Sequence, residues 1–174
     1  PFCKLYYCRN RASVPPPFIR VGCSVPSPYH GLPDGALRYT RCMNTESIFS
    51  KIVSGEIPSH KIYEDEHTLA FLDIYAVIPG HTLVIPKQQV EFVWDLDDES
   101  YQSLMRSVKK VAKRLRSEMG TSFVAEKIIG VDVPHAHVHL IPFNEVEEVH
   151  RANQDNAEPD HDKLYALAQK LFFE

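Results

Sequence analysis

Three histidines alternate with apolar residues in one short segment, residues 135–139, which reads His-Ala-His-Val-His. Successive side chains of a β-strand point to opposite faces, so the three imidazoles would share one face, and Ala136 and Val138 the other. Imidazoles fill a protein core poorly, because each buried ring nitrogen needs a hydrogen-bond partner. The segment therefore predicts a strand that packs its apolar face against a core and carries a functional site on its other face.

Apolar periodicity elsewhere predicts an α+β fold with about five strands. Apolar side chains recur at helical spacing from Leu104 to Met119, with acidic residues before them and Gly120 after them, which predicts one long helix against the sheet. Shorter helices are predicted at either end, one over 47–53 capped by Asn44 or Thr45 and one from Asp160 to Phe172. Strands are predicted over residues 61–64, 69–73, 82–85, 122–129 and 136–141, and a loop over 144–160.

The first 42 residues differ in composition from the rest of the chain. They hold all four cysteines and seven of the 13 prolines, and they carry six basic side chains but a single acid, Asp34. They show no sustained helical or strand period, and their prolines would interrupt either. We expect residues 1–42 to be a disordered or non-native extension and residues 43–174 to form the folded domain. The alternatives for the extension are a targeting peptide and a cysteine-based metal or disulfide module.

The composition of the whole chain argues against two classes of partner. The net charge of −4 is mild, so nothing global points to nucleic acid. No apolar run approaches the ~18 residues of a membrane span. Residues 43–174 contain no cysteine, which is compatible with the cytoplasm. We therefore expect a cytoplasmic protein that binds neither nucleic acid nor membrane.

The alternating histidines allow three interpretations when they are considered alone. They could form a structural cluster, although each imidazole would then need buried partners. They could bind a metal, since His-x-His on a strand is a common zinc-ligand pair. They could also catalyse a reaction, with one neutral imidazole attacking phosphorus while its neighbours bind the phosphate oxygens.

The segments around the histidines resemble the histidine triad (HIT) superfamily of nucleotide hydrolases and transferases. Its signature alternates three histidines with apolar residues and ends on two apolar residues, as in 135–141, His-Ala-His-Val-His-Leu-Ile. Two more blocks match in the same order, residues 47–58 and residues 71–87. The resemblance covers about residues 45–142 and implies an antiparallel sheet, a catalytic domain over 43–174 and a homodimer.

The resemblance also implies roles for individual residues. His137 corresponds to the nucleophile that becomes nucleotidylated, and His135, His139 and His81 correspond to histidines that contact phosphate and tune protonation. Asp73 corresponds to the carboxylate that accepts hydrogen bonds from the ribose hydroxyls. The apolar pocket that clamps the base would be formed by Ile48, Phe49, Ile52 and Ile74.

The implied activity is attack at the α-phosphate of a purine nucleotide derivative, such as an adenosine phosphoramidate, an aminoacyl-adenylate or a diadenosine polyphosphate. The reaction would pass through a covalent nucleotidyl-histidine and would need no cofactor. The alternatives are a nucleotide-binding regulatory or scaffold module with little catalysis, and a metal-dependent hydrolase.

The chain departs from the family pattern just before the histidines. Many members carry a polar amide and a Gly-Gln-Ser/Thr stretch that contact the phosphate. Here Val124 stands where the amide would be, and the stretch reads Gly130-Val131-Asp132-Val133-Pro134. Asp132 would repel a phosphate unless it turned away or was paired. The departure puts the specificity for the leaving group in doubt more than the attack itself.

A second departure concerns zinc. Some bacterial relatives bind a structural zinc ion with a Cys-x-x-Cys motif in the first helix, where this chain has Ser47 and Ser50. Gln88 and Gln89 stand near the place of a further histidine ligand. Serine and glutamine are weak ligands for zinc, so we predict no structural zinc site and no metal in the catalytic site.

Overall fold

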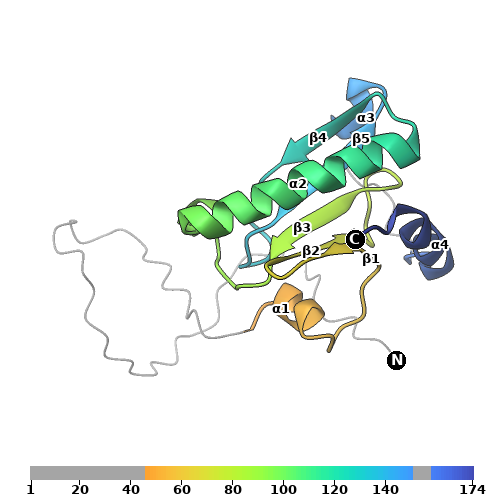
Figure 1. Cartoon of the computed structure of the whole chain (residues 1–174). Coiled ribbons are helices and arrows are strands. Elements are labelled where there is room, and N and C mark those ends of the chain that lie inside the picture. The colour runs from red at the N-terminus through yellow and green to blue at the C-terminus, as the bar shows by residue number, and fades with distance from the viewer. Residues whose placement is uncertain (1–45, 151–157) are drawn as a thin grey trace, which may run out of the picture. The chain divides into compact units, whose positions relative to one another are not determined.

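The computed structural model describes residues 46–150 and 158–174, which form a five-stranded antiparallel sheet with helices on both faces (Figure 1). The predicted extension, residues 1–42, lies outside the described residues. The α+β architecture expected from the sequence is confirmed. In chain order the elements are α1 (Ile48–Val53), β1 (Lys61–Glu64), β2 (Thr68–Leu72), β3 (Thr82–Pro86), the 3₁₀ helix η1 (Val93–Asp95), α2 (Asp98–Met119), β4 (Phe123–Lys127), β5 (Val138–Phe143), α3 (Val146–His150) and α4 (His161–Leu171).

The strands lie in the order β1-β2-β3-β5-β4, and every neighbouring pair is antiparallel. The first three strands form a meander, whereas α2 separates β3 from the β4–β5 pair. The last strand of the sequence, β5, therefore enters the sheet beside β3 and places the histidine segment near its centre.

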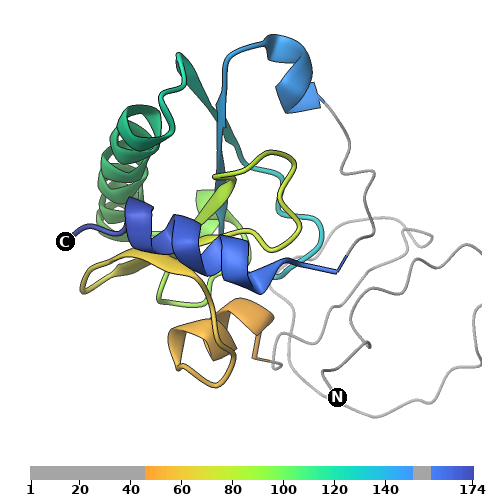
Figure 2. The same ribbon diagram turned by 90° about the vertical axis from the view of Figure 1, so that its right-hand side faces the viewer.

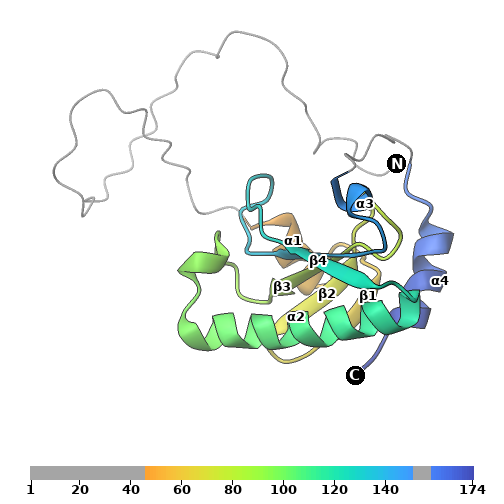
Figure 3. The same ribbon diagram turned by 90° about the horizontal axis from the view of Figure 1, so that it is seen from above.

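The sheet separates two apolar cores (Figure 3). The long helix α2 covers one face and the short helix α1 covers the other. On β5 and the residues before it, Ala136, Val138 and Leu140 belong to the core with α2, as the alternation predicts. The core with α1 is smaller and consists of Phe49, Ile52, Leu69, Phe71, Leu83 and Ile85.

Local sequence signals explain where the two helices that flank the sheet begin and end. The Asp97 carboxylate accepts a hydrogen bond from the Ser100 N–H and caps α2, and Gly120 ends the helix with a φ of 64°. Helix α1 is capped by Ser47, whose hydroxyl accepts from the Ser50 N–H. The predicted caps Asn44 and Thr45 lie outside the described residues, and the observed cap, Ser47, stands two or three positions later in the sequence.

Two other predictions need correction. The last strand runs to Phe143, although we predicted that Pro142 would end it. Proline is tolerated there because the pairing with β3 stops at Leu140, so β5 continues beside β4 alone. The predicted loop over 144–160 contains α3, whose first turn is capped by Glu148: its carboxylate accepts from the N–H groups of Asn144 and Glu145. Residues 151–157 lie outside the described part of the chain.

The C-terminal helix α4 is capped by Asp160, the residue predicted to start it, and packs against β1, β2 and α2 (Figure 2). After it, the Phe173 N–H donates to the Ile62 carbonyl over 3.1 Å, and the Phe173 ring stacks on Tyr63. Arg114 of α2 donates to the carbonyls of residues 170, 171 and 172 and so fixes the end of α4. Among the described helices, none combines the length and the apolar character that crossing a bilayer would require.

Candidate functional site

The three histidines of residues 135–139 lie on the sheet face that carries α1. His135 is completely buried, His137 is 6% exposed and His139 is half-buried. Strand β5 itself begins at Val138, so His135 and His137 precede its ladder. The alternation of side chains still extends back to Ala136, because that residue lies in the opposite core.

Both ring nitrogens of His135 have partners within the protein. Nε2 lies 2.8 Å from the Pro86 carbonyl oxygen and Nδ1 lies 2.8 Å from the Ser47 hydroxyl. A carbonyl oxygen can only accept, so Nε2 carries the proton and Nδ1 accepts from Ser47. Burial lowers the pKa of His135, and the hydrogen bond to Pro86 opposes this effect. In this arrangement both ring nitrogens of His135 are therefore occupied by partners within the protein.

A network of polar groups surrounds the His135–Ser47 hydrogen bond. The Ser50 hydroxyl donates to the Gln89 side-chain oxygen over 2.6 Å, and the Ser47 N–H donates to the same oxygen over 3.0 Å. These residues include the positions where the resemblance places zinc ligands in some relatives. Hydrogen bonds therefore link α1, the segment after β3 and the histidine segment at this place.

The ring of His137 is held in one orientation by the backbone. Its Nδ1 lies 2.6 Å from the carbonyl oxygen of His135, so Nδ1 carries a proton and Nε2 presents a lone pair. The ring of Phe49 meets the His137 ring edge to face, with centroids 5.4 Å apart. The contact with the His135 carbonyl therefore fixes which tautomer a neutral His137 adopts, with the free lone pair on Nε2.

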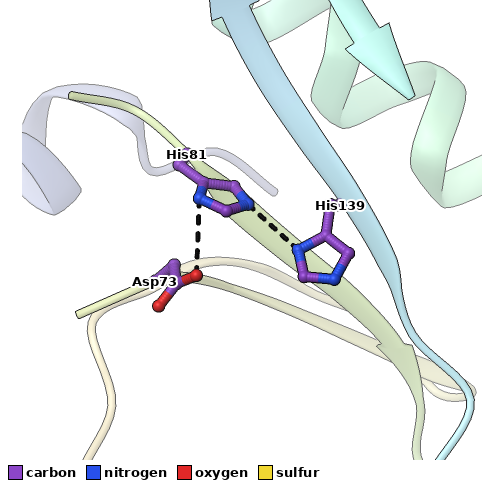
Figure 4. A group of neighbouring side chains, drawn as sticks. All are labelled: Asp73, His81 and His139. Atoms are coloured by element: carbon purple, nitrogen blue, oxygen red, sulfur yellow. Dashed lines mark hydrogen bonds and ion pairs between the residues drawn. The ribbon is translucent and has the colours of Figure 1, made fainter. Parts of the chain in front are cut away.

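Asp73, His81 and His139 form a connected row (Figure 4), and the ring of His139 meets the ring of His137 edge to face. His81 Nδ1 lies 3.4 Å from the Asp73 carboxylate, and His81 Nε2 lies 3.0 Å from His139 Nδ1. Burial lowers the pKa of His81, and the Asp73 carboxylate raises it. Burial, followed by the charges of His81, His137 and Lys127, lowers the pKa of His139 to about 4. Both imidazoles are therefore neutral at pH 7 when no anion is bound.

The same row is the place where the described residues could hold a cation. Asp73, His81 and His139 each offer one ligand atom, and these atoms lie within 4.8 Å of one another. Two imidazoles and a carboxylate are a ligand set that suits zinc and similar ions. Asp73 also accepts from the Tyr75 N–H over 2.9 Å, and its second oxygen keeps lone pairs for a further donor.

The four predicted pocket residues differ in exposure. Phe49 and Ile52 are buried in the core under α1, where Phe49 also contacts the rings of Phe71 and His135. Ile48 is 41% exposed and Ile74 is 42% exposed, so both side chains are accessible to a ligand. The structure thus brings Phe49 against the ring of His137 and leaves Ile48 and Ile74 on the surface.

A further residue of the site face was missed by the sequence analysis. Lys127 on β4 is the direct cross-strand partner of His139, so the two side chains leave the sheet on the same face. Val124, which stands where relatives carry an amide, packs into the core with α2 and points away from the site. The alternation along residues 123–127 is the signal that could have identified Lys127.

The loop before the histidines brings no side-chain donor of the family's kind to the site. Asp132 and Val131 are exposed to solvent, and Gly130 adopts a φ of 68°, which favours glycine. The Ala136 N–H donates to the Val90 carbonyl over 2.6 Å and closes the end of the loop.

Comparisons with known proteins agree with the fold and the histidine row. The family model of the HIT domain matches residues 54–146. Protein hit of Bacillus subtilis is 46% identical over 100 residues, which cover 55% of this chain and 69% of that protein. Adenosine 5'-monophosphoramidase HNT1 of Saccharomyces cerevisiae is 35% identical over 132 residues, which cover 74% of this chain and 82% of that protein.

The solved structures include a Hit-like protein from Bartonella henselae, which aligns with a TM-score of 0.61 and 31% identity over 72% of this chain and 93% of that chain. The residues matched by the HIT family model, 54–146, contain the sheet, α2 and all three alternating histidines. The chain therefore belongs to the HIT domain family.

Proposed function

We propose that this protein is a nucleotide hydrolase or transferase that acts at the α-phosphate of purine nucleotide derivatives, with His137 as the nucleophile. The observation that carries the proposal is the contact between His137 Nδ1 and the His135 carbonyl, 2.6 Å long, because it directs the Nε2 lone pair away from the backbone. The name of the yeast relative, a monophosphoramidase, supports the same reaction class.

The reaction has two displacements. Nε2 of His137 forms a bond to the α-phosphorus while the bond from phosphorus to the leaving nitrogen or oxygen breaks, and the leaving group takes a proton. Water then attacks the same phosphorus and passes a proton to His139, the phosphorus–nitrogen bond to His137 breaks, and the nucleoside monophosphate is released. Two steps of this kind replace a single displacement with a higher barrier.

Proton transfer to the leaving group falls to His139 in this proposal. Its pKa of about 4 in the free protein makes it a poor proton donor at pH 7. A bound phosphate brings negative charge next to the imidazole, which favours its protonated form and raises its pKa. His81 and Asp73 support this change, since a carboxylate at the end of the row stabilises positive charge on the imidazoles.

The nucleoside end of the substrate would lie between α1 and Asp73. The Asp73 carboxylate has lone pairs left for two ribose hydroxyls, and Ile48 and Ile74 offer exposed apolar surface for a base. Phe49 would separate this region from the buried network around His135.

Mass spectrometry of the full chain, quenched seconds after mixing with an AMP phosphoramidate, tests the proposal. We expect wild type and His67→Ala to gain one nucleotidyl group, because His67 is exposed and precedes β2, at the end opposite to Asp73. The His137→Ala variant should gain none. An adduct on His137→Ala would show that another residue is the nucleophile.

The alternative functions predict different results. A binding or scaffold module would bind AMP without forming an adduct or releasing the amine. A metal-dependent hydrolase would lose turnover in a chelator, whereas we expect turnover to persist.

The homodimer implied by the family stays part of the proposal. Strand β4 is an edge of the sheet, and its Phe123 is 56% exposed and stacked on Phe143. Light scattering after size-exclusion chromatography would test this: the mass of two chains would support a homodimer, and the mass of one chain would contradict it.

A further inference from the structure

We propose that Lys127 binds an anionic group on the leaving part of the substrate, so that the enzyme favours leaving groups that carry phosphate over leaving groups that are amines. This inference rests on the proposed function and names the substrate class of the same site. It assigns to one side chain the contact that the chain lacks in the loop before the histidines.

The position of Lys127 is fixed by strand register. Lys127 pairs directly with His139 across β4 and β5, and side chains of such a pair stand about 5 Å apart on one face of the sheet. Both neighbours in sequence point elsewhere: Ile128 packs in the core with α2, and Glu126 pairs with Leu140 of that core. Lys127 is therefore the residue of this part of β4 that faces the histidine row.

The two sides of the row differ in charge. Asp73, at the end of β2, lies on one side of His139, and Lys127, at the end of β4, lies on the other. If Asp73 holds the ribose, an extended substrate crossing the row places its leaving group on the side of Lys127. The lysine charge contributes to lowering the pKa of both His81 and His139, which agrees with its nearness to the row.

The ammonium group of Lys127 has capacity for a ligand. It donates to the Val149 carbonyl of α3 over 2.9 Å and, within residues 46–150 and 158–174, it pairs with no carboxylate. A lysine ammonium has three donors, so two remain for other acceptors. A half-buried cation that lacks a counterion gains most from an anion of the ligand.

At the positions where many relatives carry side chains that contact phosphate, this chain offers no such donor beside His139. Val124 lies on the opposite face of the sheet, and Asp132 is exposed and negatively charged. An amine leaving group needs a proton and no cation, whereas a departing nucleoside diphosphate carries several negative charges. Lys127 would stabilise the second kind as its charge develops.

Two substrates with the same nucleotidyl part test the inference: an AMP phosphoramidate, which releases an amine, and diadenosine triphosphate, which releases ADP. For Lys127→Gln we expect kcat/KM to fall about tenfold or more with diadenosine triphosphate, the loss typical of one charge-assisted hydrogen bond. With the phosphoramidate it should change by about twofold at most, within the effect of one screened charge. Lys127→Arg should retain most activity toward both, since it keeps the charge. Lys113→Gln, an exposed lysine on α2, removes the same charge far from the row and should change neither.

Equal losses on the two substrates, or no loss on either, would overturn the role of Lys127 and leave the proposed function intact. So would a wild type that turns over the phosphoramidate alone. Calorimetry keeps the test independent of turnover: diadenosine triphosphate should bind His137→Ala about tenfold more tightly than His137→Ala/Lys127→Gln. Equal Kd values would contradict the inference, whereas a lack of adduct on wild type with both substrates would contradict the proposed function.

Discussion

The hydroxyl of Ser47 lies 2.8 Å from Nδ1 of His135, and this hydrogen bond joins the first turn of α1 to the histidine segment. The same hydroxyl caps α1 by accepting from the Ser50 N–H. One side chain therefore both caps a helix and donates to a buried imidazole whose tautomer is set by the Pro86 carbonyl.

We predict that Ser47→Ala destabilises the protein by about 1–3 kcal/mol, because it removes a helix cap and leaves a buried imidazole nitrogen without a donor. Urea unfolding measures the change. Ser54→Ala, at an exposed position at the end of the same helix, should stay within about 0.5 kcal/mol of wild type. Equal stabilities for the two variants would show that the Ser47–His135 bond contributes nothing.

The network around His135 should be convertible into a zinc site. We expect Ser47→Cys/Ser50→Cys/Gln89→His to bind one zinc ion per chain more than wild type, through two thiolates and two imidazoles. The four side chains already contact one another here, so the backbone needs little movement. Metal analysis after dialysis and the Tm with and without zinc provide the readout; no added zinc and an unchanged Tm would contradict the prediction.

His137→Ala should lower kcat by at least about a thousandfold, because a nucleophile that forms a covalent intermediate has no substitute nearby. The Kd for AMP should change little, since the proposed base and ribose contacts involve other residues. Steady-state kinetics and AMP titration separate the two effects. A variant that keeps turnover but loses affinity would assign His137 to binding.

Protonation of the row should weaken the fold in mild acid. The pKa of His139 is lowered from 6.5 to about 4, so between these pH values the unfolded chain binds more protons than the folded one. Stability should therefore fall by about 1–2 kcal/mol as the pH drops from 6.5 to 4, after a discount for partial exposure.

Unfolding of wild type and His139→Asn across this range tests the assignment. The variant should show a shallower slope, whereas an unchanged slope would mean that other groups cause the loss. The carboxylate of Asp65, with a pKa of about 2, titrates in a separate window below pH 4.

Much of the fold could be predicted because its signals are local. The apolar spacing from Leu104 to Met119 predicts the body of α2 and Gly120 predicts its end, whereas the acidic residues before Leu104 mark its start only as a region. Alternation predicts the faces of β5. The cap of α1 was misplaced because the choice among serine, threonine and asparagine depends on where the chain meets the sheet. The effect of Pro142 was predicted wrongly because a proline is tolerated in β5 only where the strand no longer pairs with β3.

The residues of the proposed site could be named from the sequence more readily than the contacts between them. The sequence names His81, Asp73 and the three histidines, but it does not reveal that His135 uses both nitrogens inside the protein. That arrangement depends on Pro86 and Ser47, which lie far away in the chain. Lys127 was not predicted as a site residue because its place beside the row depends on its pairing with His139. The register between two strands cannot be read from the sequence of either strand alone.

The row and Lys127 together draw on four neighbouring strands, because Asp73 follows β2, His81 precedes β3, His139 lies on β5 and Lys127 on β4. Backbone hydrogen bonds between these strands set the spacing of the four side chains. A slip of one residue in any strand would turn its side chain to the other face and remove it from the row. During refolding, recovered turnover would therefore count only those molecules whose strands have found their native alignment. Chains that are compact and show the spectrum of a folded protein, but whose strands are out of register, would show no turnover.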